Sequence, residues 1–77
     1  MNASEIVEIA AHNRKSYPTI HIQHPRNPGV NYVAVAQVLV KWEDGNWYEA
    51  VAYCPLGRPD LIYTRRVDNF QKFTRAN

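Results

Sequence analysis

The feature that most constrains the fold is an Asp44-Gly45 pair between two long runs of β-branched and aromatic residues. The runs extend over residues 32–42 and 47–53. Asp-Gly is a preferred two-residue hairpin turn, because both central residues of that turn need a positive φ. The sequence therefore predicts a long antiparallel hairpin with Asp44 and Gly45 at its tip.

This turn also predicts a register, because directly opposed residues of two antiparallel strands share a face. On one face the expected pairs are Trp42 with Trp47, Val40 with Glu49, Val38 with Val51 and Ala36 with Tyr53. The other face would carry Lys41, Leu39, Gln37, Val35, Tyr48, Ala50, Ala52 and Cys54. Neither face is wholly polar, so we expect both to be partly covered, one of them by a helix.

A short helix is expected before the hairpin. Apolar residues at three- and four-residue spacing predict it over residues 3–13. Asn2 or Ser4 would cap it; with Asn2 as the cap, Glu5 takes the third helical position, as in a capping box. A helix of this length is marginal alone and must dock on another element.

Shorter elements complete the chain. Alternating residues predict strands over 19–24 and 61–65, and loops rich in proline and glycine are expected at 25–29 and 55–60. Apolar residues recur every three positions near the end, which predicts a closing helical turn before a polar tail. The residues of that turn are Val67, Phe70 and Phe73.

These elements predict an α+β fold in one domain, 1–77. We expect a short N-terminal helix packed on a small, strongly twisted, barrel-like antiparallel sheet of about four strands, with a short C-terminal helical turn. A chain of 77 residues has room for one core, and this size argues against an elaborate enzyme.

Composition narrows the class of protein. Hydrophobic residues make up 45% and charged residues 21%, which is typical of a globular domain. A net charge of +2 neither implies nor excludes nucleic acid as a partner. Cys54 is the only cysteine, which fits a reducing compartment. No apolar run approaches the ~18 residues of a membrane span, so we expect a cytoplasmic protein that does not bind membranes.

Three segments carry a resemblance. The opening runs from His24 to Val35, the exit of the hairpin reads Val-Ala-Tyr-Cys-Pro-Leu over 51–56, and the closing segment reads Tyr-Thr-Arg-Arg-Val-Asp-Asn-Phe over 63–70. They resemble a family of small bacterial and phage domains of unknown function, which have a Tyr-Arg-His-Phe-Lys-Gly-like opening, a Val-Val-Tyr-Arg-Pro-Leu exit and a Trp-Val-Arg-Pro-Leu-x-x-Phe close. The resemblance spans about two thirds of the chain. It implies a small β-rich domain, often phage-encoded, with no assigned activity.

Catalytic and metal-binding motifs are absent from the sequence. His12, His21, His24 and Cys54 are the only metal-ligand types beyond carboxylates. In a strand, His21 and His24 would point to opposite faces, so we expect no metal and no cofactor. A reactive Cys54 would need a nearby base, and we expect a small buried apolar residue instead. The sequence thus predicts no enzymatic activity.

Aromatic and basic residues are the candidate contact residues. Trp42 and Trp47 would either clamp the hairpin or present an apolar surface to a partner. Arg65 and Arg66, with Arg58, Lys72, Arg75 and the interleaved Tyr63, would form either a phosphate-binding strip or an ordinary solvated surface. Because neighbours in a strand face opposite ways, only one of Arg65 and Arg66 can join a given surface.

The leading hypothesis is a non-enzymatic, phage-encoded binding protein that docks on a host or phage protein and modulates it. The expected partner-binding residues are Trp42, Trp47, Tyr48, Arg58, Tyr63, Arg65 and Arg66. One alternative is sequence-tolerant binding of nucleic acid, and another is a nucleotide held between the loops at 25–29 and 55–60. Apolar residues on both sheet faces also leave a homodimer open.

Overall fold

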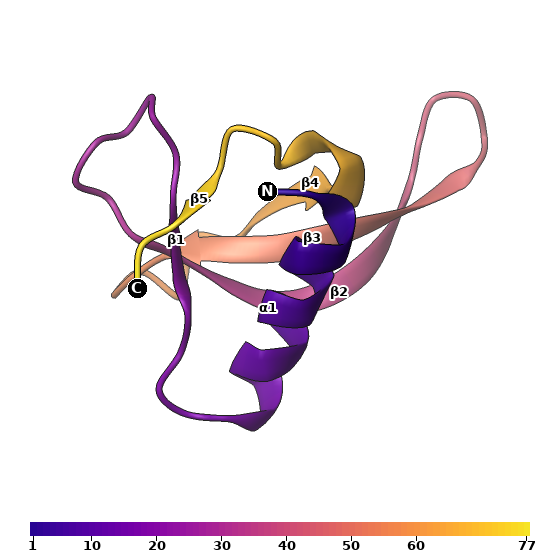
Figure 1. The fold of residues 1–77 in the computed structure, drawn as a ribbon. Coiled ribbons are helices and arrows are strands. Elements are labelled where there is room, and N and C mark those ends of the chain that lie inside the picture. The colour runs from indigo at the N-terminus through magenta and orange to yellow at the C-terminus, as the bar shows by residue number, and fades with distance from the viewer.

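The computed structural model describes all 77 residues, as one helix and one five-stranded antiparallel sheet (Figure 1). The elements are α1 (Ala3–Lys15), β1 (His21–Gln23), β2 (Tyr32–Lys41), β3 (Trp47–Pro55), β4 (Tyr63–Arg66), the 3-10 turn η1 (Val67–Asn69) and β5 (Thr74–Arg75). The strand order is β4-β3-β2-β1-β5. This confirms the α+β prediction, although the sheet has two free edges, β4 and β5, and is not a closed barrel.

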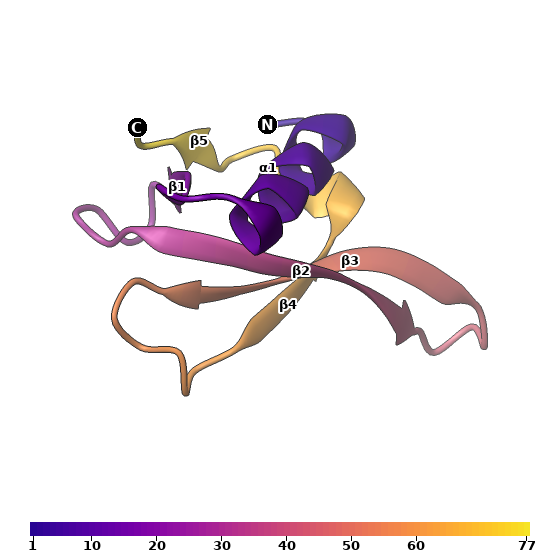
Figure 2. The ribbon, with the colours of Figure 1, turned by 90° about the horizontal axis from the view of Figure 1, so that it is seen from below.

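The helix covers one face of the sheet. Figure 2 shows α1 on one side of β2 and β3 and no helix on the other side. The buried core lies between α1 and the sheet and is closed by the segment after β4. It consists of Ile6, Ile9, Ala10, Ile22, Tyr32, Ala34, Val51, Tyr53, Phe70 and Phe73. We call the uncovered side the open face.

Local sequence explains the start of α1. The Asn2 side chain accepts a hydrogen bond from the Glu5 N–H at 2.8 Å, so Asn2 is the cap and Ser4 is not. Ile6, Ile9 and Ala10 form the buried stripe. The helix is two residues longer than predicted, because it continues to Lys15.

Asn13, on the extra turn of α1, ties the helix to the sheet. Its side-chain amide donates to the carbonyls of Ile20 (3.1 Å) and Ala34 (2.9 Å), and its side-chain oxygen accepts from the Ile20 N–H (2.7 Å). These bonds occupy the backbone of Ile20, and β1 begins only at His21 rather than at residue 19. The Tyr17-Pro18 peptide bond between the two elements is cis.

The hairpin is confirmed, but its predicted register is wrong by one residue. A two-residue turn of the predicted type needs a positive φ at both positions, and only Gly45 has one, at 83°. The loop instead has three residues, 43–45, closed by hydrogen bonds from the Trp42 N–H to the Asn46 carbonyl (2.9 Å) and from the Gly45 N–H to the Trp42 carbonyl (3.0 Å). Lys41 therefore lies opposite Trp47.

A second irregularity decides which β2 residues enter the core. The register with β3 shifts between Ala34 and Ala36, so Val35 is an extra residue in β2. Each side chain beyond this bulge falls on the opposite face from the one that strict alternation would give. Tyr32 and Ala34 consequently face the core, whereas Val38 pairs with Ala50 on the open face.

The C-terminal segment closes the core as predicted and then adds a strand that was not predicted. η1 precedes Phe70 and Phe73, which are 0% and 2% exposed. Residues 74–75, expected as a polar tail, form β5 and pair with β1. Because β5 follows η1, the loop at 70–73 is brought beside the loop between β1 and β2 (Figure 1).

Candidate binding grooves at the sheet edge

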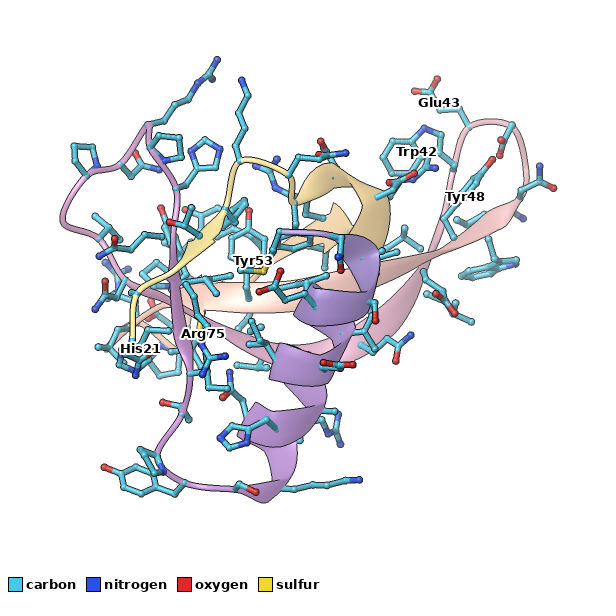
Figure 3. All side chains as sticks on the ribbon, in the orientation of Figure 1. His21, Trp42, Glu43, Tyr48, Tyr53 and Arg75 are labelled. Carbon is cyan, nitrogen blue, oxygen red and sulfur yellow. The ribbon has the colours of Figure 1, made fainter.

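The two tryptophans of the hairpin lie on opposite faces. The corrected register places Trp47 on the face that carries α1, beyond the end of the helix, beside the exposed Leu39. Trp42 lies on the open face, near Tyr48 (Figure 3). Their exposed fractions are similar, 62% for Trp47 and 50% for Trp42. The prediction that they share one face is therefore wrong, because the turn has three residues instead of two.

Trp42, Tyr48 and Arg66 form a stacked cluster, which we call the Trp42 cluster. The Arg66 guanidinium carbon lies 4.0 Å from the Tyr48 ring centroid and 5.3 Å from that of Trp42. Arg66 also forms an ion pair with Asp68 at 3.1 Å. Such cation–π contacts order an arginine without removing its charge.

Asp44 anchors this cluster to the turn. Its carboxylate accepts hydrogen bonds from the Tyr48 hydroxyl and from the Asn46 N–H, the latter at 2.9 Å. The bond from Tyr48, followed by that from Asn46, holds the pKa of Asp44 below its usual value. The turn and the cluster are thus connected through one ionised side chain.

Arg65 points to the other face of β4, toward the core side. Its guanidinium carbon lies 5.1 Å from the Phe73 ring centroid. Its Nε donates to the Tyr53 hydroxyl (3.4 Å) and its terminal nitrogen to the Asn69 carbonyl (3.3 Å). Tyr63 lies beside it, with its ring centroid 5.6 Å from that of Tyr53.

A groove of about 740 Å³ runs along β4 and brings both sides of this strand together. We call it the edge groove. Its lining residues are Val40, Trp42, Ala50, Tyr53, Tyr63, Thr64, Arg65, Arg66, Asp68 and Asn69. Four of the seven predicted partner-binding residues, Trp42, Tyr63, Arg65 and Arg66, line it, and Tyr48 supports it through Arg66.

A second hollow, of about 510 Å³, adjoins the edge groove at Arg65 and Asn69. It is lined by His24, Arg26, Arg65, Asn69, Gln71 and Lys72, none of them hydrophobic. We call it the cationic pocket. Sequence reasoning missed His24 and Arg26, because the pairing of β1 with β5 alone brings their loop beside residues 69–72.

No acidic group neutralises the cationic pocket. The two ion pairs in the protein join Arg58 to Asp60 and Arg66 to Asp68, so Arg26, Arg65 and Lys72 have no acidic partner. The pKa of His24 is lowered, first by partial burial of its ring and then by the positive charges of Arg65, Arg26 and Lys72. Excess positive charge is therefore concentrated here.

The remaining predicted residue, Arg58, is separate from these grooves. It lies in the loop between β3 and β4 and makes a two-pronged ion pair with Asp60, with both distances 3.1 Å. That pair raises the pKa of Arg58 and lowers the pKa of Asp60. Residues 55–60 border neither the edge groove nor the cationic pocket.

The candidate ligand and nucleophile residues lie apart. His12 bonds to the Pro18 carbonyl (3.0 Å), His21 to the Thr19 hydroxyl (3.1 Å), and Cys54 is a buried free thiol. No three histidine, cysteine or acidic side chains lie close enough together to hold a metal ion. The one helix is too short to cross a membrane.

Comparison of the chain with protein-family models, curated proteins and solved structures finds no match. The resemblance to small phage domains thus rests on the three sequence segments described above and stays a prediction.

Proposed function

We propose that the protein is a non-enzymatic binding protein that docks on a partner protein through the edge groove and the Trp42 cluster. The observation that carries this proposal is the convergence of Trp42, Tyr63, Arg65 and Arg66 on one groove. Tryptophan, tyrosine and arginine are the residues most enriched at the centres of protein interfaces. Trp47 and Arg58 are left out, because Trp47 faces the other side and Arg58 is bound to Asp60.

The position of the groove suggests how a partner binds. β4 is an edge strand that pairs only with β3, so the other side of its backbone has no strand partner. An extended segment can add to such an edge through main-chain hydrogen bonds, while its side chains enter flanking pockets. The two arginines, Arg65 and Arg66, favour a segment that carries acidic side chains.

The sequence resemblance supports a phage or prophage origin, with the host cytoplasm as the place of action. A chain of this size can modulate a larger protein by occupying one surface of it. The partner in this proposal is a host or phage protein whose activity changes when the groove is filled.

A pull-down from bacterial lysate, with and without nuclease, tests the proposal. Trp42 and Trp47 provide a matched pair of variants, because both are exposed tryptophans of the same hairpin on opposite faces. We expect Trp42→Ala to weaken capture of a stoichiometric protein by about 30-fold or more, as at an interface hot spot. Trp47→Ala should capture it at wild-type strength.

The fold of both variants is checked by circular dichroism before capture is compared. Equal loss of capture in folded Trp42→Ala and Trp47→Ala would contradict docking through the edge groove. Loss of every captured protein on nuclease treatment would contradict a protein partner altogether.

A further inference from the structure

The cationic pocket has the makings of an anion site that is distinct from the edge groove. Arg26 and Lys72 come from two different loops, are both exposed, and make no side-chain hydrogen bond or ion pair within the protein. Two long cationic side chains kept near each other and near Arg65 repel one another unless an anion lies between them. Neither residue lines the edge groove.

Polar side chains that suit phosphate oxygens accompany these charges. Arg65 is held in place by Tyr53, Asn69 and Phe73, so its planar guanidinium is already oriented. A preorganised guanidinium matches the geometry of a phosphate better than a flexible ammonium does. Asn69 and Gln71 add amide groups to the same lining, and no apolar side chain is present for a hydrophobic ligand group.

An aromatic hollow adjoins the pocket. It has a volume of about 330 Å³ and shares His24, Arg26 and Arg65 with the cationic pocket. Its other lining residues are Asn27, Tyr32, Tyr53, Tyr63 and Phe73. Tyr32, Tyr53 and Phe73 are buried, whereas Tyr63 is 42% exposed and therefore has ring surface left for a ligand.

We propose that the cationic pocket binds the phosphate of a nucleotide unit whose base stacks on Tyr63. The same chemistry is offered by a free nucleotide and by one unit of a single-stranded nucleic acid. A positively charged surface beside an exposed aromatic ring is the usual arrangement for sequence-tolerant binding of single strands. An acidic peptide would satisfy the charges but would leave the Tyr63 ring without a planar partner.

Fluorescence anisotropy with a labelled ten-residue oligo-dT tests the site. If Arg26, Arg65 and Lys72 neutralise three phosphates, affinity should fall about 18-fold between 50 and 200 mM salt. In the double variant Arg26→Gln with Lys72→Gln, one contact remains, and the fall should be only about threefold. The double variant should fold, because both side chains are exposed and without internal partners.

A matched control separates this site from general charge attraction. Arg14→Gln with Lys15→Gln also removes two positive charges, but from the end of α1, away from the pocket. It should keep the wild-type salt dependence. Tyr63→Leu should weaken oligo-dT binding about tenfold at constant salt, as expected when stacking with one base is lost, whereas Tyr63→Phe should not.

Further ligands distinguish the sources. Displacement of oligo-dT by thymidine monophosphate at a similar concentration of phosphate would assign the site to a free nucleotide, and displacement only by longer oligonucleotides would assign it to a single strand. Displacement by oligo-glutamate as effective as that by oligo-dT would overturn the proposal. So would absent binding at low salt, or equal effects of the pocket and control variants. Binding by folded Trp42→Ala keeps this test separate from that of protein docking.

Discussion

Arg65 and Arg66 are neighbours in β4, yet their guanidinium groups lie over different aromatic rings on opposite sides of the sheet. Arg65 lies 5.1 Å from the Phe73 ring centroid and Arg66 lies 4.0 Å from that of Tyr48. Alternation along a strand requires this division. One arginine consequently belongs to the cationic pocket and the other to the Trp42 cluster, while both border the edge groove.

The contact between Arg66 and Tyr48 should contribute measurably to stability. In a double-mutant cycle of Arg66→Gln and Tyr48→Leu, we expect a coupling free energy of about 0.5–1 kcal/mol, as for a partly exposed cation–π pair. The cycle of Arg65→Gln with Tyr48→Leu is the control, and its effects should add within about 0.5 kcal/mol because these residues are not in contact. Chemical denaturation measures both. Equal coupling in the two cycles would disprove the assigned contact.

The corrected hairpin register predicts a specific set of NMR contacts. Trp42 and Asn46 are hydrogen-bonded to each other, so the next pair, Lys41 and Trp47, is a wide-spaced position where the Cα atoms approach most closely. A strong cross-strand NOE is therefore expected between the Hα protons of Lys41 and Trp47. An NOE between the Hα protons of Trp42 and Trp47 in its place would restore the two-residue turn.

Asn13→Ala should destabilise the protein by about 2 kcal/mol, because it leaves partly buried backbone groups of Ile20 and Ala34 without partners. Asn13→Asp should also destabilise it, since a carboxylate cannot donate to either carbonyl. Asn69→Ala is a suitable control, because the exposed side chain of Asn69 makes no hydrogen bond within the protein, and its effect should stay within about 0.5 kcal/mol. A loss for Asn13→Ala as small as that of the control would show that α1 is held by apolar contacts alone.

His24 should titrate below its ordinary pKa of 6.5. Partial burial and the charges of Arg65, Arg26 and Lys72 all disfavour its protonated form in the folded protein. A lowered pKa means that the folded state binds this proton less tightly than the unfolded state. The stability linked to His24 is therefore present above pH 6.5 and is lost as the pH falls through the folded-state pKa.

NMR titration of the His24 ring measures this pKa directly. Arg26→Gln with Lys72→Gln should move it upward, and so should saturation with oligo-dT, because phosphate charge stabilises the imidazolium. A pKa at or above 6.5 in the free protein would show that the pocket does not concentrate positive charge as described.

The elements that were predicted well depend on residues close together in sequence. The cap of α1 is a contact between Asn2 and Glu5, and the buried stripe of that helix follows from residues three and four apart. The two long strands follow from their β-branched and aromatic composition. Local contacts of this kind are present whatever the rest of the chain does.

The register was mispredicted because two conformations of the turn are compatible with Asp44-Gly45. In the structure Gly45 alone has a positive φ, and Asp44 bonds to Asn46 and Tyr48 instead. A one-residue change in the turn moves every side chain of one strand relative to the other. The expected pairing of the tryptophans was lost for this reason, although both residues were correctly placed in the hairpin.

The amino-acid sequence by itself determined α1, the hairpin and the burial of the closing aromatics Phe70 and Phe73, since local spacing and composition dictate each of them. Tertiary structure decided the bulge at Val35, the pairing of β5 with β1, and hence the meeting of His24 and Arg26 with Arg65 and Lys72. These features depend on which face of the sheet α1 covers and on contacts between residues far apart in the chain. Their free energy is gained only when the whole core closes, so no local pattern in the sequence records them.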